Sequence, residues 1–354
     1  FNYAKLTYDA SFDPYNNAVK AFRKYIRAYP NSPRVEQAYE YITKVYLSSK
    51  NYDQALRSIE NMGPLNDQLK RAYQLICYNK ATELFQNDLH STAVNYYDRS
   101  LKYTVDKELV AKTNFWKAEA FYRTNLFDEA IESYKEFFYQ PTAILQDEFN
   151  EANYNLGYAY FKLKDYENAQ KWFRKFVYYK DETDSNRLAD AYLRTGDCFF
   201  VNKAYEDASQ YYKNGVEIDA LDQDYGLFQL AISHGLSKKP DEKIKTLEKL
   251  VANYKESNLV DASFYELGRS YLLKNDDKKA MSYFASVIET MPNSDYMKRC
   301  LLNKALINYN NGQNDEALAG FKRIVNDYPT YEDSKEALLG IKNIYIENGN
   351  IDKY

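Results

Sequence analysis

Residues able to carry out catalysis are few in this sequence and far apart. The chain contains two histidines, His90 and His234, and three cysteines, Cys77, Cys198 and Cys300. No group of them has the spacing of metal ligands, and neither a C-x2-C pair nor a glycine-rich phosphate loop occurs. His90 lies in a polar turn, where we expect a solvated side chain. The sequence therefore predicts no metal site, no cofactor, three free thiols and no histidine-based relay.

Carboxylates are abundant, and paired acids are the remaining candidates for hydrolytic chemistry. Two examples are the runs at 181–184 (Asp-Glu-Thr-Asp) and 222–224 (Asp-Gln-Asp). Both lie between predicted helices, where solvated turns are the expected structure. Catalytic acid pairs face each other across a cleft, and the periodicity gives no sign of one. We therefore predict that the protein is not an enzyme.

The composition excludes several broad classes. The 354 residues include 38 Tyr but only 11 Gly and 8 Pro, too few turn residues for a β-sandwich or barrel. An aromatic content of 17% argues against disorder. The 47 basic and 51 acidic residues nearly balance, so a general nucleic-acid binder is not expected. No stretch of 18 apolar residues predicts a transmembrane helix.

A small residue recurs at intervals of 35 to 39 residues, which indicates one repeat array. It occurs at Ala18, Ala55, Ala93, Ala130, Ala169, Ala208, Ala280 and Ala317. Lys243 takes the missing place, which predicts a looser contact around 227–250. Each unit holds two helical patterns, such as 152–163 and the stripe that contains Phe173, separated by a short polar turn. Because one helical hairpin cannot bury its apolar face alone, neighbouring hairpins must stack.

The repeat unit resembles the tetratricopeptide repeat. Phe264-x2-Leu267-Gly268-x2-Tyr271, followed by Ala280-x3-Phe284 and Pro292, matches its full pattern. The resemblance covers essentially the whole chain, from the second helix of one unit (Ala18) to the first helix of another (Leu338). It implies an all-α, right-handed superhelical solenoid of about nine stacked helix-turn-helix repeats, forming a single domain over 1–354. Gly157, Gly196 and Gly268 should lie where the two helices of a hairpin approach closely.

The resemblance also implies that the first helices line a concave groove that binds extended segments of other proteins. Projection of the helical faces directs ten aromatic residues toward it. They are Tyr78, Phe85, Phe115, Tyr122, Tyr154, Tyr158, Phe161, Phe200, Phe228 and Tyr265. Tyrosine offers apolar contact area together with a hydroxyl group, as at many protein interfaces. The same aromatics could instead stack on sugars, so a carbohydrate- or peptidoglycan-binding solenoid is the alternative function.

A second resemblance concerns the joint between repeats. Residues 29–38 read Tyr-Pro-Asn-Ser-Pro-Arg-Val-Glu-Gln-Ala, similar to joints in bacterial cell-envelope proteins such as outer-membrane assembly lipoproteins and cell-division coordinators. The richness in Tyr, Asn and Lys resembles long repeat proteins of Bacteroidota. These features imply a scaffold in an envelope assembly (outer-membrane protein assembly, secretion or cell-wall machinery), periplasmic or outer-membrane-associated. A cytoplasmic adaptor is the alternative.

Both ends of the sequence suggest a piece of a longer protein. The chain starts at Phe1, and residues 349–354 read like a turn that opens another helix. We expect further repeats, and a preceding segment could tether the protein to a membrane.

Overall fold

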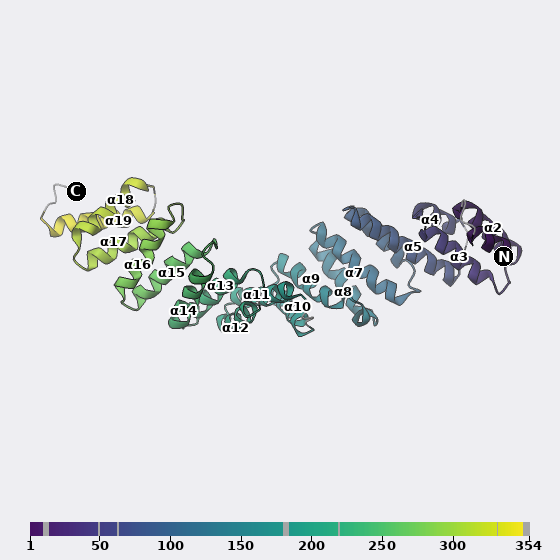
Figure 1. Cartoon of the computed structure of the whole chain (residues 1–354), viewed down its shortest axis with the longest axis horizontal. Coiled ribbons are helices and arrows are strands. Elements are labelled where there is room, and N and C mark those ends of the chain that lie inside the picture. The colour runs from purple at the N-terminus through teal and green to yellow at the C-terminus, as the bar shows by residue number, and fades with distance from the viewer. Residues whose placement is uncertain are drawn as a thin grey trace. The chain divides into compact units, whose positions relative to one another are not determined.

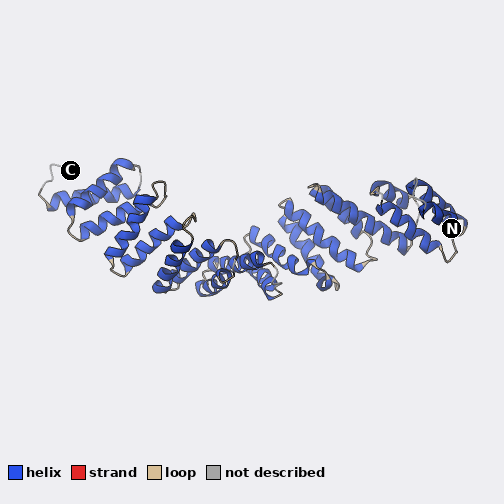
Figure 2. Cartoon of the chain, viewed as in Figure 1, coloured by secondary structure: helices blue, strands red, loops and turns tan. Residues whose placement is uncertain are grey.

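The computed structural model describes residues 1–9, 14–48, 50–61, 64–179, 184–218, 220–330 and 332–349. All regular structure in these ranges is helical, with nineteen α-helices and one short 3-10 helix (Figure 2). The predicted all-α class is confirmed. Residues 181–183 of the acidic run and residues 350–354 of the predicted final turn lie outside the described ranges.

The chain forms two compact units, Phe1–Lys180 and Asp181–Tyr354. Figure 1 labels most of their helices. In the first unit the helices are α1 (Asn2–Asp9), α2 (Pro14–Ala28), α3 (Val35–Ser48), α4 (Tyr52–Glu60), α5 (Asp67–Gln86), α6 (His90–Leu101), α7 (Lys107–Arg123), α8 (Phe127–Tyr139), the 3-10 helix η1 (Ala143–Leu145), α9 (Glu148–Lys162) and α10 (Tyr166–Tyr178).

The second unit continues the same alternation of first and second helices. Its helices are α11 (Ser185–Val201), α12 (Tyr205–Val216), α13 (Gln223–Leu236), α14 (Pro240–Asn253), α15 (Val260–Leu273), α16 (Asp277–Thr290), α17 (Met297–Asn310), α18 (Asn314–Asp327) and α19 (Glu332–Glu347). Within each unit consecutive helices pack in pairs, and each pair packs on the next. One continuous solenoid with a right-handed superhelix stays a prediction.

The start of the array differs from the prediction. α1 packs against α2 and α3, and its Ala4 is 2% exposed within the core that contains Phe22. The first repeat therefore has both of its helices, and the array does not begin at a second helix. The sequence pattern missed α1 because Leu6 holds the usual place of the small residue. In the structure this leucine is exposed rather than packed between the two helices.

Each of the eight hairpin turns from α3–α4 to α17–α18 contains one residue in the left-handed region of φ, at the same place in the repeat. These residues are Lys50, Asp88, Asn125, Lys164, Lys203, Lys238, Asn275 and Gly312. A left-handed conformation costs a residue with a Cβ roughly 1–2 kcal/mol. Helix packing on both sides of the turn must therefore impose this conformation, because seven of the eight residues are not glycine.

Small residues bring the two helices of a hairpin together, as predicted. A Cβ added to Gly157 would lie 2.8 Å from the ring of Phe173, and one added to Gly268 would lie 2.5 Å from Phe284. These separations are shorter than van der Waals contact, so each second-helix ring lies directly against the first-helix backbone. Gly196 has the same relation to Tyr212.

The hairpin α13–α14 replaces the small residue by Lys243 and compensates within the same hairpin. The place held by Phe161 or Phe200 in other repeats is Gly235 here, and an added Cβ would lie 2.9 Å from Lys243 Cδ. Large and small residues have exchanged places. Lys243 Nζ forms an ion pair with Glu266 Oε2 of α15 at 2.5 Å, and both side chains are mostly buried. A specific contact therefore occupies the place where the sequence predicted looseness.

Candidate partner-binding surface

Five of the ten predicted groove aromatics occupy the same place in five of the first helices and pack inward. They are Tyr78, Phe115, Tyr154, Phe228 and Tyr265. The ring centre of Phe115 lies 5.8 Å from that of Phe137, and that of Tyr265 lies 5.0 Å from that of Tyr296. Phe115 is 1% exposed and Tyr265 8% exposed. The structure places these two side chains in the core rather than on an accessible face.

Tyr78, Tyr154 and Phe228 are half-buried and contribute to the cores from the edge. The Tyr154 ring lies 5.0 Å from the Phe176 ring and 5.0 Å from the Tyr158 ring. Tyr158 in turn lies 5.1 Å from Phe173. At α9 the predicted groove residues thus form one aromatic cluster with the core of their hairpin.

The remaining four predicted residues form a repeated motif, which we call the turn-side pairs. Each is an aromatic residue near the end of a first helix that contacts a ring at the start of the second helix. The pairs, with ring-centre distances, are Phe85–His90 (4.8 Å), Tyr122–Phe127 (5.4 Å), Phe161–Tyr166 (5.4 Å) and Phe200–Tyr205 (5.3 Å). All eight side chains are half-buried. Each pair is held in position while part of its apolar surface stays accessible.

Sequence reasoning missed two buried tyrosine–carboxylate contacts. The residue after the small residue of the first helix is Glu119 in α7 and Asp197 in α11. Fifteen residues later each has a tyrosine of the second helix, and the Tyr134 hydroxyl donates to Glu119 Oε1, the Tyr212 hydroxyl to Asp197 Oδ1. This spacing is a signal visible in the sequence. An acid follows the small residue in two repeats whose second-helix core ring is tyrosine.

Each of these carboxylates also receives a donor from the next repeat. Asn155 Nδ2 of α9 donates to Glu119 Oε1 at 2.6 Å, and the Tyr225 hydroxyl of α13 donates to Asp197 Oδ1 at 2.7 Å. Burial raises the pKa of Glu119 above its usual 4.5, against the opposing effect of its two hydrogen bonds. The Glu119 carboxylate of α7 thus accepts hydrogen bonds from both α8 and α9. It is a structural group rather than an open ligand site.

A second missed feature lies at the ends of three successive first helices in the second unit. Val201, Leu236 and Leu273 occupy the same place in α11, α13 and α15, and they are 51%, 49% and 82% exposed. Val201 and Leu236 directly follow Phe200 and Gly235, at the turn-side position. A row of exposed apolar side chains at repeat spacing marks a surface suited to a partner.

Three descriptions of the tetratricopeptide repeat match this sequence. One matches residues 3–32, 225–257, 262–294 and 299–331, a second matches 78–137, and a third matches 151–183. Together they span more than half of the chain and both units. The chain belongs to the tetratricopeptide repeat family.

Several solved structures are similar to this chain. The C-terminal part of a tetratricopeptide protein from Cytophaga hutchinsonii is similar over 74% of this chain and 99% of its own, with 17% identity and a TM-score of 0.58. YrrB, described as a tetratricopeptide protein with an unusual peptide-binding site, covers 52% of this chain and 87% of its own at 18% identity and a TM-score of 0.43. PilF of Pseudomonas aeruginosa covers 65% and 97% at 14% identity and 0.42. No curated protein matches significantly.

Tetratricopeptide repeats are protein-interaction modules, and the three thiols of this chain are buried within the array. Cys77, Cys198 and Cys300 are buried free thiols, and burial raises the pKa of each to about 12. His90 is half-buried against Phe85 rather than solvated as predicted. No group of three or more metal-binding side chains occurs in the described ranges.

A survey of the described helices for membrane-spanning segments is also negative: none of them is both long and apolar enough to cross a bilayer.

Proposed function

We propose that this chain is a non-catalytic scaffold that binds extended segments of partner proteins along the turn-side ends of its first helices. The turn-side pairs carry this proposal, because they recur at repeat spacing and keep part of their rings accessible. Solenoids present extended surfaces of this kind to elongated ligands. Within Phe1–Lys180, which holds three of the four pairs, an extended segment would contact one pair per repeat.

The geometry of the pairs favours binding in a second way. Ordering flexible side chains on association opposes binding, typically by about 0.5–1.5 kcal/mol for each one immobilised. The Tyr122 and Phe161 rings already rest against Phe127 and Tyr166, so little further order is needed. Rigid, half-exposed aromatic rings are common anchors of protein interfaces.

We further propose that the scaffold works in a bacterial envelope assembly, in the periplasm or at the outer membrane. The support is the similarity of its Tyr-Pro-Asn-Ser joint, at 29–32, to joints of envelope repeat proteins. Fractionation of the organism that encodes the chain tests this part separately. Recovery of the protein with cytoplasmic markers would overturn it without touching the proposed binding surface.

Sugar binding finds no support in the two tryptophans. The Trp172 ring stacks on Phe138 with centres 4.9 Å apart, and Lys175 Nζ lies 3.8 Å from its centre. Trp116 meets Phe85 and Phe115 edge to face. Both rings are engaged in packing, so we do not propose the carbohydrate alternative.

The test is partner capture by the full chain carrying Tyr122→Ala and Phe161→Ala. We expect capture of partners from an envelope extract to fall at least tenfold, because two anchors are lost. The matched control is Tyr139→Ala with Tyr178→Ala, two aromatics of the same repeats that lie at the ends of second helices and are 74% and 81% exposed. Circular dichroism must show that both variants are folded. Equal capture by the two folded variants would contradict the proposed surface.

A further inference from the structure

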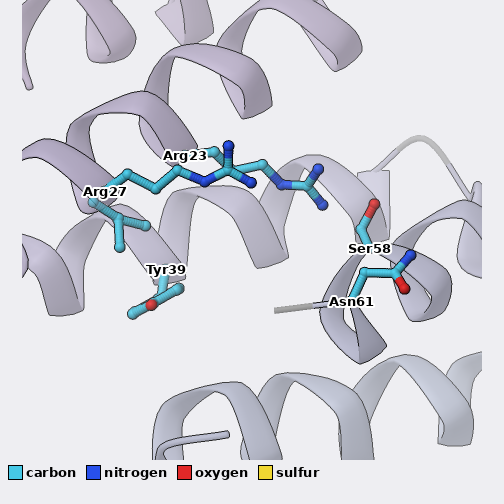
Figure 3. A pocket seen from close by; sticks show the side chains of 6 residues that line it. Arg23, Arg27, Tyr39, Ser58 and Asn61 are labelled. Atoms are coloured by element: carbon cyan, nitrogen blue, oxygen red, sulfur yellow. The ribbon is translucent and has the colours of Figure 1, made fainter. Parts of the chain in front are cut away.

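A cavity of about 220 Å³ lies among the second helices of the first two repeats and the first helix between them. It is lined by Arg23, Ile26 and Arg27 of α2, Tyr39 of α3, Ser58 of α4 and Asn61 directly after α4 (Figure 3). Its lining comes largely from second helices, so it is separate from the turn-side pairs. Drug-sized ligands usually occupy cavities of about 300–1,000 Å³, so this one suits a smaller group.

The cavity is strongly positive. α2 carries Lys20, Arg23, Lys24 and Arg27, at the spacing that places side chains on one helix face, and it contains no acidic residue. No carboxylate of the described residues forms an ion pair with Arg23 or Arg27. Glu60, the acid nearest to Asn61 in sequence, accepts hydrogen bonds from Arg99 and Tyr73 instead. Among the described residues, therefore, no ion pair neutralises the two arginines of the cavity.

The two guanidinium groups extend in the same direction, toward Ser58 and Asn61 (Figure 3). Arg23 Nη2 donates to the Tyr46 hydroxyl at 3.2 Å, which fixes that side chain, while its Nε is buried without a hydrogen-bond partner. Two neighbouring like charges are unfavourable. An anion bound between the two guanidinium groups would relieve their repulsion.

We propose that this cavity binds a phosphate group. Two planar guanidinium forks, a serine hydroxyl and a side-chain amide offer more donors than one carboxylate can use. A phosphate group has three or more acceptor oxygens and a charge close to −2, which matches two arginines. The group is either inorganic phosphate or the phosphomonoester of a modified residue, and both present the same oxygens.

Titration calorimetry with the full chain tests the site, using inorganic phosphate and, in a second arm, a short phosphoserine peptide beside its unphosphorylated form. We expect saturable binding of phosphate and at least a tenfold loss for Arg27→Gln, because one charge-assisted fork is removed. The matched control is Arg57→Gln, an exposed arginine of α4 outside the cavity, which should leave binding unchanged. Arg23→Gln, checked for folding by circular dichroism, should lose binding as well.

The two arms identify the source of the phosphate. Tighter binding of the phosphopeptide than of inorganic phosphate would indicate a modified protein segment, and equal or weaker binding would indicate the free anion. Absence of saturable binding in both arms overturns the proposal, as does an equal loss for Arg27→Gln and Arg57→Gln. Neither result depends on the turn-side pairs, so this site and the proposed function can fail separately.

Discussion

The neighbouring hairpins α7–α8 and α9–α10 close their cores by opposite chemistry. In the first, Glu119 follows the small residue and accepts a hydrogen bond from the buried Tyr134. In the second, Tyr158 takes the place of the acid, and its ring packs 5.1 Å from Phe173. The backbone arrangement is shared, yet one hairpin relies on a buried polar contact and the other on aromatic packing.

This difference shows what each solution requires from its surroundings. A buried carboxylate needs hydrogen-bond donors, and Glu119 Oε1 receives its second donor, Asn155, from the next repeat. The polar hairpin is therefore coupled to its neighbour. In the aromatic hairpin the ring that packs on Phe173 comes from the hairpin itself, and this Tyr158 ring lies 6.3 Å from Phe161, which enlarges the apolar surface available to a partner.

The largest expected effect is on the aromatic hairpin. Phe173→Ala removes a ring that is 0% exposed and contacts Tyr154, Tyr158 and Phe161. We expect a loss of about 3–5 kcal/mol in the free energy of unfolding, measured by urea denaturation. A loss below about 1 kcal/mol would mean that aromatic packing does not close this hairpin, and the contrast with α7–α8 would disappear.

A smaller effect is expected from Gly157→Leu, because the new side chain would overlap the Phe173 ring. Overpacking of this kind typically destabilises by about 1–3 kcal/mol. Lys162→Leu, at an exposed site of the same helix, should change stability by less than about 0.5 kcal/mol. Thermal melts that showed equal losses for both would place the close contact of this hairpin elsewhere.

The next test exchanges the two kinds of core contact, the tyrosine–carboxylate hydrogen bond and the aromatic packing, between the hairpins. Tyr134→Phe leaves Glu119 without one of its donors and should cost about 1–2 kcal/mol. Phe173→Tyr should cost a similar amount, because the new hydroxyl meets no carboxylate. Adding Tyr158→Glu to Phe173→Tyr should recover part of that loss in denaturation experiments. Absence of recovery would show that the buried tyrosine–carboxylate contact also depends on other residues of α7–α8.

The smallest expected effect is a dependence on pH. The folded pKa of Glu119 is raised above 4.5 by burial, so the folded state holds this proton more tightly than the unfolded state. Its contribution to stability is complete below about pH 4.5 and is lost as the pH rises through the folded pKa. The stability of the wild type relative to Glu119→Gln should therefore be highest at the acidic end of a scan from about pH 4 to about pH 8.

Glu129→Gln, at an exposed site of α8, is the matched control for this scan and should show no such trend. A wild type that gains stability over Glu119→Gln as the pH rises would reverse the sign and contradict a raised pKa.

Much of the fold could be predicted because its determinants are local and repeated. The alanine series located the hairpins, and the glycine positions identified the close contacts between helices. Lys243 showed the limit of a single position, since its meaning depended on Gly235 eight residues earlier and on Glu266 in the next repeat. Compensation between two positions is invisible when each is compared with the pattern alone.

The candidate site was predicted less completely, for a similar reason. Helical periodicity gives the direction of a side chain, whereas its exposure depends on what the neighbouring helices place above it. Phe115 and Tyr265 point from the same face as Tyr78, but Phe137 and Tyr296 cover them. The phosphate cavity was missed because charges were balanced over the whole chain, while four basic residues gather on α2 alone.

Serines in two later joints, after α14 and after α16, have a structural role. Ser257 Oγ donates to Asp224 at 2.5 Å, and Ser294 Oγ donates to Asp261 at 2.7 Å, each across 33 residues. Each serine thus ties the end of one repeat to the start of its own first helix. These bonds give serine a structural role in both joints. Ser32, in the joint at 29–32, is instead hydrogen-bonded to the Tyr25 hydroxyl at 2.5 Å. A serine in a joint can thus be structural in any compartment, so localisation needs its own experiment.

The left-handed turn residues bear on how the array opens. In a linear array each hairpin contacts mainly its neighbours. The free energy of unfolding is therefore close to a sum of contributions from single hairpins and from the contacts between neighbouring hairpins. Lys164, at φ 61°, lowers the stability of its hairpin, because a residue with a Cβ is disfavoured in this conformation. Gly312 adopts the same region in its own turn without that cost. The hairpins with lysine at this turn position should therefore open more readily than the hairpin with glycine. Hydrogen exchange should begin near the lysine turns before it reaches a glycine turn. Replacing these turn residues by glycine, one at a time, would stabilise each hairpin in turn. The site that opens first would then move along the chain to the least stable remaining hairpin.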